Sequence, residues 1–565
     1  MKKPQLSELT LEEKIGQMLL GRQEDINRKT EEDFDVFRTW EEKKAFIEKE
    51  KAGTLWALTG HIHRGMPEDK NPDKSHVLGG RVLDGSREYG EWISAQSDCY
   101  KIPALTALDA EQGGGTLFYD LSVLSPPFAI AATKDENLAY EMGAALAREL
   151  RCAGVTWRWG PTVDSTNRFN LSFMRSYAPY DPDVQLKFAL AHAKGIQSEG
   201  VAACAKHFPG NDYNEYRDSH YSQTKIRSTK EQWYQEQGKV FQGLFDGGVY
   251  SVMVSHIAFP AIDDELIKGK YVPSTISKKV ITDLLKNEMG FDGVVITDAL
   301  RMAGVFNLFP YDELIIRFVN AGNDVLLDVL PDTGKIIKKA VEEGKISEER
   351  IDDACRRILD MKEKIGMFED GYTLVKGVSE EVTPKTRELN MEIARKAVTL
   401  IRDRNDLLPV DKNKVKKVKV ICSAHSDELF DQLDVLKKEF EKRGAEVSIQ
   451  RRLSNGRELK KISAEYDLIL YAATLDFHAP WGMTSFYNEE CITFMFACSS
   501  GNEKSIGISF GHAYIHYDFM ENVNTFINTY GRGPELMKAL VEAIYGEIEM
   551  TGESPVPIDP PATVL

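Results

Sequence analysis

Short apolar runs recur along the first part of the chain, separated by longer segments that have the polar pattern of helices. Near-continuous runs of Val, Ile and Leu that alternate with helices are typical of a parallel sheet covered on both faces. About seven such units favour an α/β barrel over an open sheet. We therefore predict an α/β fold that starts with a (β/α)8 TIM-like barrel. Its expected strands are residues 53–58, 104–108, 155–159, 201–205, 249–254, 293–297 and 324–327.

A second α/β pattern fills the last part of the chain. It follows a helix-rich stretch, in which Ser347 has the pattern of a helix N-cap, and a charged, irregular segment at 369–386. Five expected strands in roughly 170 residues fit an open αβα sandwich. The sequence thus predicts a barrel domain at 1–368, a linker at 369–390 and a C-terminal αβα sandwich domain at 391–565. The strands expected in the sandwich are residues 397–401, 418–422, 445–449, 468–471 and 504–509.

The composition is that of an ordinary globular protein with more than one domain. At 565 residues the chain exceeds what one hydrophobic core normally supports, and 42% of its residues are hydrophobic and 28% charged. A formal charge of −17 argues against a nucleic-acid backbone or an anionic membrane surface as the main partner. A neutral sugar is compatible with this charge.

The cysteines and the first residues indicate a cytoplasmic location. The seven cysteines are scattered and form no CxxC pair, which favours reduced and mostly buried thiols. The first eight residues contain two lysines but no apolar run behind them, which argues against a signal peptide. No stretch approaches the ~20 apolar residues of a membrane span.

The densest group of ionisable residues begins where one expected strand ends. Lys206 and His207 follow the run at 201–205, a Pro-Gly turn comes next, and Asp218-Ser219-His220 begins eight residues beyond that turn. Burying so many ionisable groups unpaired costs several kcal/mol each, so a packed core has no use for them. In parallel α/β folds the carboxyl ends of the strands are where chemistry is built. We interpret this segment as the active-site loop of an enzyme.

Other expected strands also end in polar groups. Asp109 follows the run at 104–108 and precedes a glycine-rich turn, and alone it would be interpreted as an acidic turn. Asp298 follows the run at 293–297, where a carboxylate at the rim is favoured over the alternative of a helix N-cap. His256 ends another strand, and a structural histidine with satisfied hydrogen bonds is the better interpretation there.

Together these groups resemble the β-N-acetylglucosaminidase branch of glycoside hydrolase family 3, in its two-domain form, over nearly the whole chain. Residues 9–18 are similar to the family's opening helix, and 397–409 are similar to its hinge into the second domain. Several ordered motifs are far more specific than any single one. The motifs that match in order are KHFPG at 206–210, DSH at 218–220, PSTIS at 273–277 and ITDAL at 296–300.

The resemblance implies a role for each matching residue. Asp298 would be the catalytic nucleophile and His220 the general acid/base, with Asp218 orienting the imidazole and making it more basic. Residues two apart on an extended loop point to the same side, so a carboxylate at 218 can reach an imidazole at 220. This pair would replace the second carboxylate that most glycosidases use. The sugar and its acetamido group would be contacted by Asp109, Arg175, Lys206 and His207.

Two departures from the family pattern reshape the loops around the expected site. No arginine follows the glycines at 113–115, and the seven residues at 211–217 are one more than in the commonest form of the loop. Both changes bear on which sugar and aglycone bind. The spacing between Asp218 and His220 is kept.

The implied activity is that of a retaining exo-glycosidase, a β-N-acetylhexosaminidase that releases N-acetylglucosamine, with cell-wall fragments as one candidate source. A histidine carries no negative charge after it donates its proton, so we also hypothesise that phosphate can replace water as the acceptor. The alternatives are a β-glucosidase of the same family, against which Asp218-Ser219-His220 argues, and a catalytically inactive sugar-binding module. We expect a small carbohydrate substrate, no nucleic-acid or membrane partner, and a monomer or homodimer.

No metal site and no cofactor are expected. His61 and His63 are interpreted as an isolated loop pair, and neither a Walker-type glycine loop nor a dinucleotide fingerprint is present. The charged segment at 22–51 looks like a helical insertion after the first helix. The aromatic loop at 477–483 fits two interpretations equally well, a cap over the barrel mouth or an interdomain packing loop.

Overall fold

The computed structural model describes residues 2–22, 55–57, 85–98, 100–170, 172–330, 332–424, 428–475, 485–486 and 489–560. The predicted helical insertion beyond Arg22, the His61 and His63 pair and the aromatic loop at 477–483 lie outside these residues. The chain divides into two compact units. The first comprises Met1–Ser122, Tyr140–Ser165 and Ala189–Thr386, and the second comprises Val123–Ala139, Thr166–Phe188 and Arg387–Leu565.

The first unit contains an eight-stranded parallel sheet in the order β10-β1-β2-β3-β4-β5-β6-β9. The sheet curls, because a parallel bridge between Ile296 and Val325 links the strands at its two edges. All seven strands predicted for the first domain are present. Their bounds, with that of β1, are β1 Leu19–Arg22, β2 Leu55–Ala57, β3 Thr106–Leu108, β4 Trp157–Arg158, β5 Ala202–Phe208, β6 Ser251–Val254, β9 Val294–Thr297 and β10 Leu326–Leu327.

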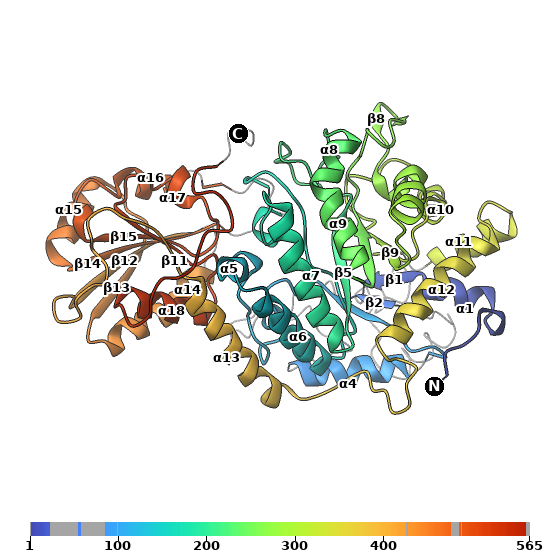
Figure 1. Ribbon diagram of the computed structural model, residues 1–565, viewed down its shortest axis with the longest axis horizontal. Helices are drawn as coiled ribbons and strands as arrows, with labels where there is room; N and C mark the ends of the chain where they lie inside the picture. Colours follow the sequence, from blue (N-terminus) through green and yellow to red (C-terminus); the bar gives the residue numbers. More distant parts are fainter. Residues whose placement is uncertain are drawn as a thin grey trace. The chain divides into compact units, whose positions relative to one another are not determined.

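Helices that follow the strands cover the curled sheet and bury its apolar side chains. Residues of α10, α11 and α12 share one apolar cluster with Trp157, Val294 and Leu326 of the strands, and Figure 1 shows these helices beside the strands. Ser347 caps α12 as predicted, because its side chain accepts a hydrogen bond from the Arg350 amide. The helices are α1 Leu11–Gln17, α4 Ser86–Ser97, α6 Glu136–Cys152, α7 Pro182–Ser198, α8 Lys230–Gln235, α9 Gln237–Asp246, η6 Lys279–Glu288, α10 Tyr311–Ala321, α11 Thr333–Glu342 and α12 Glu348–Lys364.

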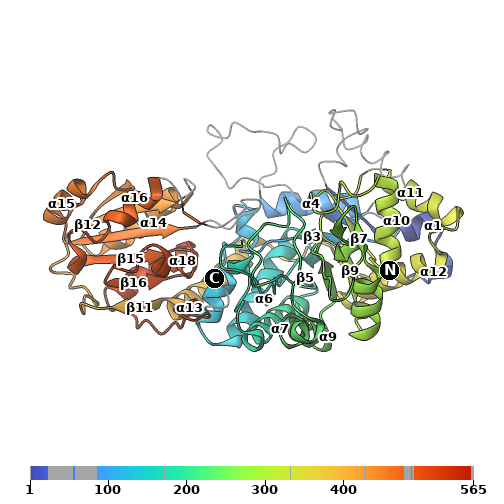
Figure 2. The same cartoon turned by 90° about the horizontal axis from the view of Figure 1, so that it is seen from above.

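The second unit contains a six-stranded sheet in the order β11-β16-β15-β14-β12-β13, in which only the β11–β16 pair is antiparallel. One apolar cluster covers it with α14 and α18, and a second cluster covers it with α15, α16 and α17. Figure 1 shows these two helix groups on either side of the strands, and Figure 2 shows the same strands from above. The strands are β11 Thr399–Asp403, β12 Lys417–Ala424, β13 Glu446–Arg451, β14 Leu468–Thr474, β15 Ser505–Ser509 and β16 Thr525–Asn528. The helices are α5 Pro127–Ala132, α13 Ser379–Ala397, α14 Glu428–Lys442, α15 Gly456–Glu465, α16 Glu489–Phe496, α17 Ile515–Asp518 and α18 Pro534–Ile544.

Two segments from the range predicted for the barrel domain belong to the second unit. Phe128 and Phe173 pack in the same apolar cluster as the second sheet, and the Phe173 ring stacks on His512 with 5.3 Å between centroids. Arg168, also in this unit, is buried and forms an ion pair with Asp518 at 3.0 Å. Apolar burial and ion pairing of these two segments therefore make the unit discontinuous in sequence.

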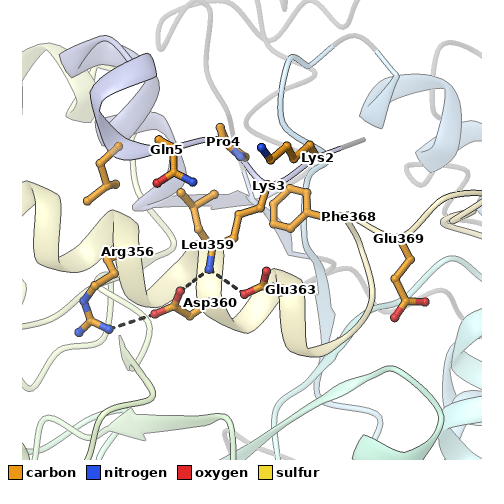
Figure 3. Close-up of a pocket in the computed structure, with 11 residues that line it drawn as sticks. Lys2, Lys3, Pro4, Gln5, Arg356, Leu359, Asp360, Glu363, Phe368 and Glu369 are labelled. Carbon is orange, nitrogen blue, oxygen red and sulfur yellow. Dashed lines mark hydrogen bonds and ion pairs between the residues drawn. The ribbon is translucent and has the colours of Figure 1, made fainter.

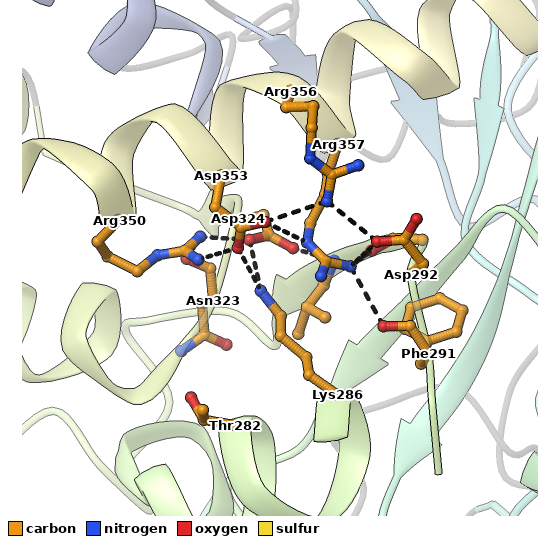
Figure 4. A network of polar contacts seen from close by, with 12 residues as sticks. Thr282, Lys286, Phe291, Asp292, Asn323, Asp324, Arg350, Asp353, Arg356 and Arg357 are labelled. Carbon is orange, nitrogen blue, oxygen red and sulfur yellow. Dashed lines mark hydrogen bonds and ion pairs between the residues drawn. The ribbon is translucent and has the colours of Figure 1, made fainter. Parts of the chain in front are cut away.

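A network of buried ion pairs fastens the amino-terminal ends of β9 and β10 to α12 (Figure 4). Lys286 on η6 donates to Asp324 at 2.8 Å, and the other Asp324 oxygen accepts the Val295 amide at 2.9 Å. Arg350 of α12 pairs with the same carboxylate. Each charge has an opposite partner, which is the condition for burying charges without a large penalty. The network lies at the strand ends opposite to those that carry Asp298, so we assign it a structural role.

Lys362 of α12 is a buried lysine whose hydrogen-bond acceptors are neutral. Its ammonium group donates to the Gln17 side chain at 2.5 Å and to the Pro103 carbonyl at 2.7 Å. Burial lowers the pKa of Lys362 to about 7. Between that value and its ordinary value of 10.5 the unfolded chain binds the extra proton, so unfolding free energy rises with pH across this window.

Replacing Lys362 by Met should remove this pH-dependent term. The quantity to follow is the unfolding free energy of the unmodified protein minus that of Lys362→Met. We expect this difference to rise between pH 7 and pH 9.5 by up to about 1.4 kcal/mol per pH unit. Urea unfolding at several pH values measures it. Lys364→Met, an exposed change on the same helix, is the control and should leave the slope unchanged. Parallel profiles for Lys362→Met and the unmodified protein would contradict the assignment.

Candidate active site

The carboxylate of Asp298 stands directly after β9, at the carboxyl end of the first sheet. Its backbone amide donates to the Val254 carbonyl at the end of β6, at 2.8 Å, which continues the ladder between the two strands. Its Oδ1 accepts the Ala299 amide, also at 2.8 Å. Regular strand pairing therefore fixes where this carboxylate leaves the sheet.

Three histidines set the charge state of Asp298. Burial alone would raise the pKa of its carboxyl, but electrostatic interactions with His207, His256 and His220 and the hydrogen bond from the Ala299 amide outweigh burial and hold the pKa below its usual range. The carboxylate is thus anionic at neutral pH. These interactions also bring together the residues predicted from three different places in the sequence, at 207, 220 and 298.

His220 is held by the carboxylate of Asp218. The imidazole Nδ1 lies 2.7 Å from Asp218 Oδ1, and the same oxygen accepts the His220 amide at 2.8 Å. The Asp218 side chain is 1% exposed and that of His220 is 35% exposed, so a buried acid orients an imidazole that solvent and ligands can reach. The His220 carbonyl accepts the amide of Ala303, which ties this loop to the chain just after Asp298.

Buried carboxylates hold the loop that leads to Asp218. Glu215 is almost fully buried and accepts from Arg217 Nε at 2.8 Å, with Arg227 Nη2 at 3.5 Å. Burial would raise the pKa of the Glu215 carboxyl, but the Arg217 guanidinium outweighs it and lowers the pKa. Asp212 accepts the Arg227 amide at 2.6 Å and so closes the base of the loop. The longer loop seen in the sequence is therefore cross-linked by its own charges.

Lys206 lies near the end of β5 and is buried between two carboxylates. Its ammonium group lies 2.5 Å from Asp109 and 2.8 Å from Glu111, both in the turn after β3. Lys206 and Asp109 were predicted, and the structure joins them. Glu111 was not among the predicted site residues, although its position two residues after Asp109 was a usable signal.

His207 pairs with Asp164, which sequence reasoning missed. The imidazole Nδ1 lies 2.9 Å from Asp164 Oδ2, and the His207 amide donates to Oδ1 of the same group at 3.1 Å. Asp164 is buried in the loop after β4. This second histidine–carboxylate pair repeats the arrangement at Asp218 and His220, but its two members are far apart in sequence.

His256 is the structural histidine that the sequence predicted, because both ring nitrogens have partners. Nδ1 lies 2.8 Å from Thr275 Oγ1 and Nε2 lies 2.9 Å from the Ala299 carbonyl. Burial lowers the pKa of this imidazole. Its contact with the residue after Asp298 gives it a positioning part in the site as well.

Arg175 is the one predicted site residue that lies in the second unit, whereas the other six lie in the first. It ends the short helix η4 (Phe173–Arg175), and its Nη1 lies 3.5 Å from Ser172 Oγ. Its predicted contact with the sugar stays a prediction.

Another part of the described chain contains a pocket in which charged side chains are arranged differently. A cavity of about 620 Å³ beside α12 is lined by Lys3, Asp360 and Glu363, but there the lysine already pairs with both carboxylates (Figure 3). Among the described residues, no three His, Cys, Asp or Glu side chains gather as a metal site would require. Nor does any described helix combine the length and apolar character needed to cross a bilayer.

Comparison with known proteins adds four findings. Residues 10–361 match the profile of the Glycosyl hydrolase family 3 N terminal domain. A protein of Cellulomonas fimi named Beta-N-acetylglucosaminidase/beta-glucosidase is 25% identical over 542 residues, which cover 90% of this chain and 93% of that protein. A Beta-hexosaminidase of Chromobacterium violaceum is 32% identical over 276 residues, 46% of this chain and 75% of its own. The solved structure of Beta-glucoside phosphorylase BglX shares the fold, with a TM-score of 0.79 at 24% identity over 98% of this chain and 94% of that one.

Proposed function

The chain belongs to glycosyl hydrolase family 3, and on that premise we propose that it is a retaining exo-glycosidase that releases N-acetylglucosamine from β-linked glycosides. The observation that supports this proposal best is the charge relation around Asp298, an anionic carboxylate that interacts with His220, itself held by buried Asp218. A nucleophile and a proton donor on one site are what a retaining mechanism needs.

In the first step Asp298 would attack the anomeric carbon and form a glycosyl ester. The bond from that carbon to the glycosidic oxygen breaks, and the imidazolium of His220 gives its proton to the departing oxygen. Because Nδ1 faces Asp218, we assign the proton transfer to Nε2. Asp218 stays anionic and stabilises the imidazolium before transfer.

In the second step the neutral imidazole of His220 would take a proton from water while the water oxygen attacks the anomeric carbon. The ester bond to Asp298 breaks, and the sugar leaves with its β configuration retained. Lys206, His207, Asp109 and Arg175 are proposed to bind the sugar hydroxyls and acetamido group, since charged groups make strong hydrogen bonds to hydroxyls. Glu111 and Asp164 would hold Lys206 and His207 in place.

The same geometry supports phosphorolysis as a second candidate reaction. His220 carries no negative charge after it donates its proton, so an anionic phosphate could approach the glycosyl ester without meeting a second carboxylate there. A phosphate oxygen would then attack the anomeric carbon, the bond to Asp298 would break, and sugar 1-phosphate would leave. Two alternatives to the proposed function are a β-glucosidase of the same family, which releases glucose from β-glucosides, and a sugar-binding module without catalytic activity.

A substrate panel tests the proposal directly. We expect 4-nitrophenyl N-acetyl-β-glucosaminide to be turned over faster than 4-nitrophenyl β-glucoside, and sugar 1-phosphate to form when inorganic phosphate is added. Product analysis by ³¹P NMR detects the phosphorylated sugar. Turnover without sugar 1-phosphate would exclude phosphorolysis and leave the proposed hydrolysis standing. A preference for the glucoside would favour a β-glucosidase. No turnover of either glycoside would favour the inactive sugar-binding module.

We also propose a domain arrangement and a cellular location for the enzyme. The catalytic part would be a (β/α)8 barrel within residues 1–368, followed by a linker at 369–390 and by the strands of the αβα sandwich at 391–565, whose unit also takes in Val123–Ala139 and Thr166–Phe188. We place the enzyme in the cytoplasm, where the six thiols that the structure describes, four of them buried, would stay reduced.

A further inference from the structure

Two exposed tyrosines flank the proposed proton donor on its own loop. The exposed fraction of Tyr216 is 50% and that of Tyr221 is 58%. Tyr221 directly follows His220, and Tyr216 lies two residues before Asp218. Large aromatic side chains usually lose most of their exposure on folding, so two exposed ones beside a site residue point to contact with a ligand.

The loop that presents these rings is held on both sides. Glu215 and its arginine partners fix the part before Tyr216. After Tyr221, the Gln223 side chain donates to the Tyr271 carbonyl at 2.5 Å. Between the two rings, the amides of Tyr221 and Ser222 both donate to the Asp218 carbonyl, at 3.2 and 3.1 Å, and form a tight turn. A ligand that binds rings on a fixed segment loses less ordering free energy on binding.

The direction of bond cleavage identifies the part of the substrate that meets this loop. His220 must approach the glycosidic oxygen, and that oxygen leaves with the aglycone. The aglycone therefore departs on the side of His220, whereas Asp298 works on the sugar that stays bound. Groups flanking His220 on its loop are thus neighbours of the aglycone and not of the released sugar.

We propose that Tyr216 and Tyr221 form a platform for a pyranose ring in the aglycone, so that the enzyme prefers substrates in which the leaving group is itself a sugar. This inference rests on the proposed function. An aromatic face contacts the apolar C–H face of a sugar ring, and the phenol hydroxyl is a hydrogen-bond partner at the edge. The two rings would act as specificity-determining residues.

The test compares two substrates that share the released sugar but differ in the leaving group. For N,N′-diacetylchitobiose we expect Tyr216→Ala and Tyr221→Ala each to lower kcat/KM roughly tenfold, because each change removes the contact of one aromatic ring with the aglycone. For methyl N-acetyl-β-glucosaminide the change should stay under about twofold. Phe at either position should retain most activity on the disaccharide, because the ring face remains. Tyr140→Ala, an exposed change on α6, is the matched control and should leave both substrates unaffected.

The pair of substrates separates a platform from damage to the loop. Both leaving groups are alkoxides that need a proton, so a displaced His220 would slow both reactions together. Equal losses on the two substrates, or no loss on the disaccharide, would overturn the platform while the glycosidase itself stands. Failure of the unmodified enzyme to cleave either substrate would instead overturn the proposed function and the platform with it.

Discussion

Replacing Asp298 by Asn is expected to lower kcat for aryl N-acetyl-β-glucosaminides by a factor on the order of 10⁴ or more. Asn keeps the shape of the side chain and its contact to the Ala299 amide but cannot form the glycosyl ester. The anionic state of Asp298, kept by the nearby histidines, is also lost. Steady-state release of the aryl leaving group measures the effect, and Asp283→Asn, an exposed change on η6, is the control.

A second variant distinguishes a missing nucleophile from a damaged site. Asp298→Ala opens space on the face from which the carboxylate would attack. Added azide should enter there, displace the aryl group and form an α-glycosyl azide, in which the anomeric configuration is inverted. Recovery of that product by NMR would identify the position as the nucleophile. If Asp298→Asn instead keeps activity within about tenfold of the unmodified enzyme, another group attacks the sugar.

The site residues that could be predicted lie in short motifs that are recognisable along the chain, even where their partners are distant, as for Lys206 and Asp109. Asp298 was predictable because a strand of three apolar residues and Thr297 leads straight to it. Asp218 and His220 were predictable because two positions separate them. Asp164 could not be found in this way, because its contact with His207 depends on how β4 and β5 pair. Long-range contacts of this kind carry no local pattern.

The parts of the fold that were not predicted also lack a clear local pattern. β1 was not predicted because its residues directly continue the apolar pattern of α1. β16 is short and ends in Asn528, which weakens its strand pattern. The segments that carry Phe128 and Phe173 fall within the barrel domain predicted at 1–368. Their place in the second unit is decided by packing on residues more than 300 positions away, such as His512.

Replacing His220 by Ala should affect substrates in proportion to their need for a proton. For methyl N-acetyl-β-glucosaminide we expect kcat/KM to fall by about 10²- to 10⁴-fold, the usual contribution of a general acid. For the 2,4-dinitrophenyl glycoside, whose leaving group departs as a stable anion, kcat/KM should change by less than about tenfold. kcat/KM is the right quantity, because it reports the first step, before His220 would act as the proposed base toward water.

A change of Asp218 tests whether the Asp218–His220 pair acts together in proton transfer. Asp218→Asn keeps a hydrogen-bond partner at Nδ1 but removes the negative charge that would stabilise the proposed imidazolium. It should therefore show the same leaving-group pattern with a smaller loss, whereas Ser219→Ala between them should show none. Equal losses of Asp218→Asn and His220→Ala on both kinds of leaving group would mean that the pair shapes the loop and does not transfer the proton. A graded series from activated to unactivated leaving groups decides between these outcomes, because only proton transfer makes the loss depend on the leaving group.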